Sequence, residues 1–87
     1  MTVTATNERM VFSVTSERNP QRAYRVDLTA NAGAGECSCK DWATRRGPAL
    51  RNGGEAWTAA TMCKHVRAAG RTFLRDLLKA MADSETE

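Results

Sequence analysis

Two short pairs of metal-binding residue types constrain this chain more than any other feature of its sequence. One residue separates Cys37 from Cys39, one separates Cys63 from His65, and 23 residues lie between the pairs. These four are all the cysteines and the only histidine among the 87 residues. Structural zinc sites commonly draw four Cys and His ligands as two close pairs on either side of a loop. The sequence therefore predicts one structural Zn²⁺ held by Cys37, Cys39, Cys63 and His65.

Other uses of the cysteines explain the pattern less well. Three cysteines cannot all pair within one chain, and Cys37 and Cys39 are too close to form an unstrained disulfide. They could instead be small buried apolar residues, with His65 on the surface, but that interpretation leaves the pairing unexplained. A chain of this length also buries too little apolar surface to be stable without an added constraint. A bound metal would supply it.

The spacing of the second pair limits where a helix can begin. Residues i and i+2 of a helix point about 200° apart, so Cys63 and His65 cannot both face one ion from a helix interior. Cys63 is therefore expected at or before the first turn. Three thiolates and a neutral imidazole leave the cluster with about one negative charge, which a helix N-terminus, Lys40 and Lys64 would favour.

Hydrophobic periodicity predicts a hairpin before the first pair and a helix after the second. Apolar residues alternate in two runs joined by a turn at Asn19-Pro20, with Met10, Phe12 and Val14 in one run and Tyr24, Val26 and Leu28 in the other. From about residue 62 to residue 82 the period is helical. The apolar face of this helix, predicted to cover the hairpin, consists of Met62, Val66, Ala69, Gly70, Phe73, Leu77 and Met81.

These elements predict an α+β fold: a small zinc-stabilised β-hairpin followed by a long C-terminal α-helix. We expect a flexible N-terminus over residues 1–8, one zinc-binding domain over residues 9–82, and an acidic flexible tail over residues 83–87. Asp41 is expected to cap one or two helical turns through Arg46, which Gly47-Pro48 ends. A loop would follow to residue 60. Trp42 and Trp57 are expected to pack over the metal site, or alternatively to contact a partner.

The order Cys-x-Cys, spacer, Cys-x-His resembles the SWIM zinc-finger family, which is similar in its leading β-hairpin and following helix. The matching segments are Val11–Thr29, Glu36–Trp42 and Met62–Val66, although the spacer is longer than in many members. The resemblance implies zinc ligation by the four paired residues. It also implies binding to DNA or protein, because family members serve as accessory modules in chromatin-remodelling helicases, transposases, ubiquitin ligases and recombination mediators.

The charge is unevenly distributed, and this suggests a partner surface. Residues 37–79 carry nine basic groups and three acidic ones, whereas residues 1–36 are balanced and residues 80–87 are acidic. A basic helix stripe and loop suit nucleic-acid phosphates, although such charges also solvate ordinary helix faces. The expected contact residues are Lys40, Arg45, Arg46, Arg51, Arg67, Arg71, Arg75 and Lys79.

We therefore expect a non-catalytic zinc-finger module that binds nucleic acid or associates with DNA-processing machinery. The alternative is a protein-binding adaptor or inhibitor of phage or mobile-element type, with Leu74, Leu78 and Met81 as a contact seam. Four protein ligands would close the coordination sphere, which disfavours an enzyme. No apolar run reaches the roughly 20 residues of a membrane span, and no secretory signal opens the chain. An intracellular protein, of bacterial or phage type from its Arg- and Ala-rich composition, is the expectation.

Overall fold

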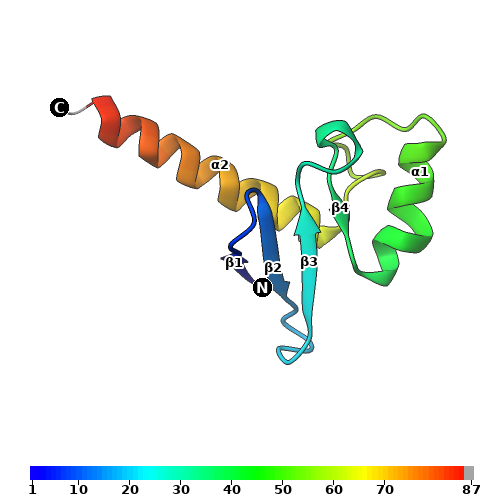
Figure 1. Cartoon of the computed structure of the whole chain (residues 1–87). Helices are drawn as coiled ribbons and strands as arrows, with labels where there is room; N and C mark the ends of the chain where they lie inside the picture. The colour runs from blue at the N-terminus through cyan, green and yellow to red at the C-terminus, as the bar shows by residue number, and fades with distance from the viewer. Residues whose placement is uncertain (86–87) are drawn as a thin grey trace.

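The computed structural model describes residues 1–85, and the side chains of residues 1–83. One four-stranded antiparallel sheet, in the order β1-β2-β3-β4, packs against the first turns of a long helix, α2 (Figure 1). A smaller helical segment lies between the last strand and α2 in the sequence and at one end of the molecule. The α+β class predicted from the sequence is confirmed.

The predicted hairpin forms the centre of the sheet. Its strands are β2 (Val11–Thr15) and β3 (Ala23–Asp27), and Phe12 pairs with Val26 while Val14 pairs with Tyr24. Val14 and Val26 are fully buried, as their alternation predicted. Met10 lies just before β2 with a positive φ of 61° and is only partly buried against the core.

The N-terminus is ordered, contrary to the expected flexible segment over residues 1–8. Thr2–Ala5 form an edge strand, β1, in which Val3 pairs with Val14 and Ala5 with Phe12. The N-terminal ammonium group also lies 2.8 Å from a carboxylate oxygen of Glu17. A strand with a single large apolar residue has no visible alternation, but its backbone completes hydrogen bonds that β2 would otherwise leave open.

The turn after Cys39 continues where the sequence predicted that it would end. A π-helical turn, η2 (Trp42–Arg46), runs directly into α1 (Gly47–Arg51), and Asp41 has helical dihedral angles without capping through its side chain. Pro48 is tolerated because the first turn of a helix needs no N–H donor there. Gly47 stays helical and leaves room for the ring of Trp42, which a Cβ atom would approach to 2.7 Å.

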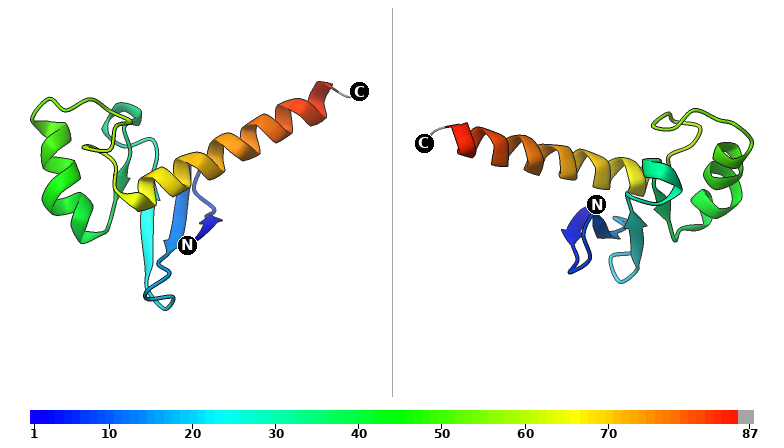
Figure 2. Two further views of the ribbon diagram at one scale, coloured as in Figure 1. Left: turned by 180° about the vertical axis from the view of Figure 1, so that it is seen from behind. Right: turned by 45° about the horizontal axis from the view of Figure 1, so that its top comes forward.

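The long helix α2 (Lys64–Glu85) covers the sheet only with its first three turns. Val66 and Ala69 are fully buried and Phe73 packs partly against the core, but every residue from Leu74 to Asp83 is exposed. Figure 2 shows the second half of α2 projecting beyond the sheet, on the side opposite α1. Leu77 and Met81, predicted to join the cover, lie past the sheet. The helix includes Asp83, which the sequence placed in a flexible tail; residues 86 and 87 of that tail lie outside the described residues.

The core occupies the space between the sheet, the turn at Trp42 and the start of α2. It contains all three cysteines beside the valines of β2 and β3, so it is both small and cysteine-rich. The chain passes from the hairpin into this space through a short 3₁₀ turn, η1 (Asn31–Gly33), and a two-residue strand, β4 (Glu36–Cys37). Among the described helices, none has the length and apolar character needed to cross a membrane.

Candidate metal centre

The first pair of predicted ligands is positioned by the edge of the sheet. Cys37 belongs to β4 and pairs with Val26, and the next residue, Ser38, exchanges two hydrogen bonds with Arg25. The chain then turns, so that the backbone N–H of Trp42 donates to Cys39 Sγ at 3.3 Å. This local hydrogen bond fixes the second sulfur beside the first.

The second pair is positioned by the beginning of α2. Cys63 immediately precedes the helix: its carbonyl accepts from the N–H of Arg67, and its Sγ accepts from the N–H of Val66 at 3.5 Å. His65 is the second helical residue. The sequence-based expectation that Cys63 lies at or before the first turn is therefore confirmed.

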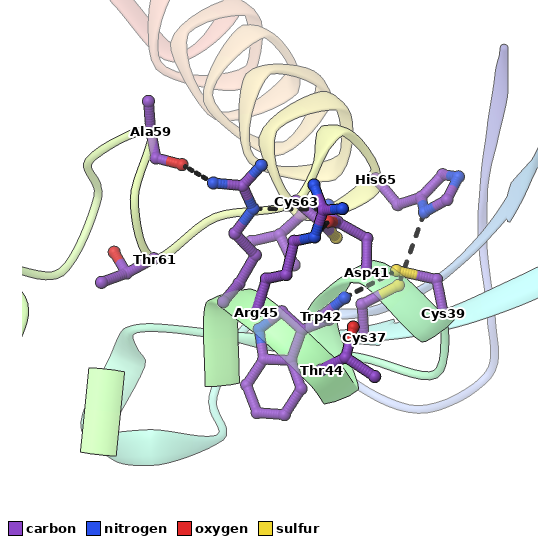
Figure 3. Close-up of polar contacts among 12 residues, drawn as sticks. Cys37, Cys39, Asp41, Trp42, Thr44, Arg45, Ala59, Thr61, Cys63 and His65 are labelled. Atoms are coloured by element: carbon purple, nitrogen blue, oxygen red, sulfur yellow. Dashed lines mark hydrogen bonds and ion pairs between the residues drawn. The ribbon is translucent and has the colours of Figure 1, made fainter. Parts of the chain in front are cut away.

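The tertiary fold brings these two pairs together in one buried cluster. All four side chains are buried, and one ligand atom from each lies within 4.8 Å of the other three. The Nδ1 atom of His65 lies 3.7 Å from Cys37 Sγ (Figure 3). Ligands bonded at about 2.0 to 2.3 Å to one tetrahedral ion lie on the order of 3.5 Å apart. The four residues could therefore bind one metal ion.

The three thiols of the cluster differ in pKa. A hydrogen bond from Cys37, helped by the backbone N–H groups of Val66 and His65, lowers the pKa of Cys63 to about 5. The same bond and burial raise the pKa of Cys37, and burial raises that of Cys39. The Cys63 thiolate is stabilised because the helix start supplies N–H donors to it. The thiolate is the form of cysteine that binds a metal ion.

The ring of His65 is held by a neighbour that the sequence analysis did not connect with the site. Tyr24 of β3 stacks on it with ring centroids 4.5 Å apart and an angle of 25° between the planes. The guanidinium carbon of Arg22 lies over the Tyr24 ring, 5.9 Å from its centroid. The outer nitrogen, Nε2, is buried without a hydrogen-bond partner among the described residues. Only strand alternation, which placed Tyr24 on the inner face, hinted at this contact.

The two tryptophans have different positions. Trp42 is 7 % exposed and packs in the core beside the cysteines, as expected. Trp57 is 53 % exposed, has a positive φ of 64°, and lies against Gly70 of α2 instead of the metal centre. The expectation that it packs over the site is wrong.

The predicted basic residues fall into three groups in the structure. Lys40, Arg46 and Arg67, together with Lys64, line a cavity of about 460 Å³ next to the cluster. Arg71, Arg75 and Lys79 continue along α2, whereas Arg45 and Arg51 lie on η2 and α1. The eight residues therefore come from two segments of the chain, residues 40–51 and α2, and Arg67 lines one hollow with Arg46 and another with Arg71.

Arg46 is engaged within the fold. Its Nε lies 3.1 Å from an Asp41 carboxylate oxygen, and one of its terminal nitrogens donates to the carbonyl of Ala59 at 2.8 Å. It therefore joins η2 to the loop that leads into Cys63. This bridge was not visible in the sequence, because the two segments are 13 residues apart and have no shared pattern.

Replacing this bridge is expected to destabilise the domain measurably. Arg46→Ala removes the hydrogen bonds to Asp41 and Ala59, and we expect the free energy of unfolding to fall by about 1–3 kcal/mol. The matched change Arg45→Ala removes only an exposed ion pair to Asp41 at 3.9 Å, which is worth at most about 1 kcal/mol. Urea denaturation of the metal-loaded proteins measures both. Equal losses for the two variants would contradict the assignment.

Comparison with known proteins adds no assignment to this geometry. No protein-family model matches the sequence, and neither a curated protein nor a solved structure is significantly similar to the chain.

Proposed function

We propose that this chain is a non-catalytic, zinc-binding interaction module that binds a protein through the projecting half of α2. The metal centre joins the sheet to the start of α2 and so fixes the direction in which the helix leaves the domain. The observation that carries the proposal is a group of large apolar side chains exposed on that projecting half and at the neighbouring Trp57.

The donor set supports zinc as the metal. Three sulfurs and one imidazole nitrogen are soft and borderline ligands, which suit Zn²⁺ better than Mg²⁺ or Ca²⁺. The motif's resemblance to the SWIM family supports the same ion. Four protein donors leave no coordination position for a substrate, and this supports a structural role over a catalytic one.

The exposed group comprises Trp57, Leu74, Leu77, Leu78 and Met81, which we call the apolar ridge. Each of these residues retains between 44 % and 63 % of its accessible surface. Single exposed apolar residues are ordinary, but a continuous group of them on a small domain marks an interaction surface. Trp57 and Leu74 line the same two hollows at the base of α2, so the group is contiguous there. A protein partner would remove this surface from water, whereas phosphates would not.

Nucleic acid is the second candidate, and one observation favours it. The basic residues of α2 lie in an arc of about 120° beside the apolar ridge, and all are exposed; they are Lys64, Arg67, Arg71, Arg75 and Lys79. Gel-shift titration at two salt concentrations tests this candidate. Binding that weakens with salt and is lost in Arg71→Glu with Arg75→Glu would support it.

Site-specific photo-crosslinking tests the protein-binding proposal. We place p-benzoylphenylalanine at position 78, on the ridge, or at position 76, which lies about 200° around the helix, and irradiate cells of the source organism. A protein adduct is expected at position 78 and at most a weak one at position 76. Leu74→Asp, a change at a side chain that is 56 % exposed, should remove the adduct without altering the far-ultraviolet circular dichroism spectrum.

Nuclease treatment separates the two candidates. An adduct that resists nuclease and is destroyed by protease supports the proposed function. Equal adducts at positions 76 and 78, an adduct that nuclease removes, or none at all would overturn it.

A further inference from the structure

The apolar ridge has the spacing of a helix-packing seam. Leu74, Leu77 and Met81 follow one another at intervals of three and four residues, the interval pattern of positions that face a second helix. Leu78 lies beside this seam on the same exposed side. The occupant with a matching repeat is therefore another helix, because an extended strand presents side chains at every second residue.

A cavity at the base of the seam provides an anchor point. It has a volume of about 320 Å³ and is lined by apolar residues, including Met10, Leu28, Trp57, Gly70, Phe73 and Leu74. Gly70 lets the ring of Trp57 lie close to α2, because a Cβ atom at residue 70 would lie 3.3 Å from that ring. The space suits one large apolar side chain inserted from the partner.

The charges beside the seam indicate which sign of charge a partner should carry. Arg67 and Arg71 line the hollow on the other side of Trp57, together with Leu74. Neither arginine forms an ion pair with any residue that the structure describes. On the far side of the helix, Asp76 is paired with Arg75 at 3.3 Å. The flank that a docked helix would meet is therefore positively charged.

From this juxtaposition we infer that the partner of the apolar ridge is an acidic amphipathic helix of another protein. Its leucine-type side chains lie along Leu74, Leu77 and Met81, one of them enters the cavity beside Trp57, and its carboxylates face Arg67 and Arg71. The inference rests on the proposed protein-binding function and adds the chemistry of the bound segment. Complementary charge contributes mainly to the choice of partner and to its rate of association.

A designed peptide series tests this chemistry directly. Three fluorescein-labelled 18-residue helical peptides share leucines at intervals of three and four, and carry Glu, Gln or Lys at the positions flanking them. Fluorescence anisotropy with the metal-loaded full chain is expected to show at least tenfold tighter binding of the Glu peptide than of the Lys peptide at low salt. The difference should shrink as salt increases. Leu74→Asp should abolish binding of all three.

Two double variants with the same net charge distinguish the effect of the arginines beside the ridge from the effect of net charge. Arg67→Glu with Arg71→Glu is expected to reverse the preference toward the Lys peptide. Arg18→Glu with Arg51→Glu changes the net charge equally at exposed positions away from the ridge, and should leave the order of affinities unchanged. Equal affinity for the Glu and Lys peptides, or reversal by both double variants, overturns the inference.

The remaining outcomes distinguish failure of this inference from failure of the proposed function on which it rests. Sedimentation equilibrium that shows a dimer abolished by Leu74→Asp means that a second copy covers the ridge, and this overturns the inference. A duplex oligonucleotide that binds the wild-type chain more tightly than the Glu peptide does, and displaces it, also overturns the inference. If the crosslink at position 78 forms but no acidic preference is found, only the inference fails. If that crosslink is absent, the proposed function fails as well.

Discussion

Chelation of the metal, or Cys39→Ser, is expected to abolish the cooperative unfolding transition of this domain. The cluster joins β4, the turn at Trp42 and the start of α2, and the remaining core is small. Structural zinc binding contributes roughly 10–16 kcal/mol in small zinc domains, which is comparable with the whole stability of about 5–15 kcal/mol of a folded domain. Circular dichroism during heating, with and without chelator, measures the loss.

A neighbouring substitution controls for damage to the core. Met62→Leu changes a buried residue next to Cys63 while conserving volume, so it should cost less than about 1.5 kcal/mol. Its transition should remain dependent on the metal, and added Zn²⁺ should restore the chelated wild-type chain but not Cys39→Ser. An unchanged melting temperature after complete metal removal would show that the cluster does not hold the fold together.

The second large effect is expected at Gly35, in the connection between the hairpin and β4. Gly35 has a positive φ of 92°, and a Cβ atom there would lie 3.0 Å from Cγ1 of Val66. Val66 is fully buried beside His65. Gly35→Ala should therefore combine backbone strain with overpacking, and lower the free energy of unfolding by roughly 2–5 kcal/mol.

Gly33 offers an almost ideal comparison for this substitution. Its φ is 93°, but a Cβ atom there would have no neighbour within 4 Å. Gly33→Ala should carry the backbone strain alone, about 1–2 kcal/mol. Urea denaturation of both metal-loaded variants separates the two contributions. If the two variants lose equal stability, the contact between residue 35 and Val66 is not a tight one.

Local patterns in the sequence were sufficient for the elements that carry the metal centre. Alternation at Phe12 and Val14 predicted β2, and the spacing of Cys63 and His65 predicted a helix start at the second ligand pair. Both predictions depend only on the period of a strand or a helix, which neighbouring residues reveal by themselves. The strand β1 was missed because its one large apolar residue, Val3, creates no period.

Other features depend on side-chain contacts that the periodicity of the sequence does not reveal. Gly47-Pro48 reads as a helix stop, yet the ring of Trp42 packs over Gly47 and the helix continues. The alternation placed Tyr24 on the inner face of the hairpin, but it did not predict that the Tyr24 ring stacks on His65 of α2. The contact of Tyr24 with His65 does not follow from local spacing, because it depends on how the chain returns past the metal centre.

The sequence by itself determined the four candidate ligands, the α+β class and the amphipathic character of α2, because residue type and period are local properties. Only the tertiary structure decided which apolar residues of α2 are buried. Val66 and Ala69 lie over the sheet, whereas Leu74, Leu77, Leu78 and Met81 lie beyond it. The apolar pattern continues along the helix after the four short strands have ended, so the same pattern gives a core at one end and an exposed ridge at the other.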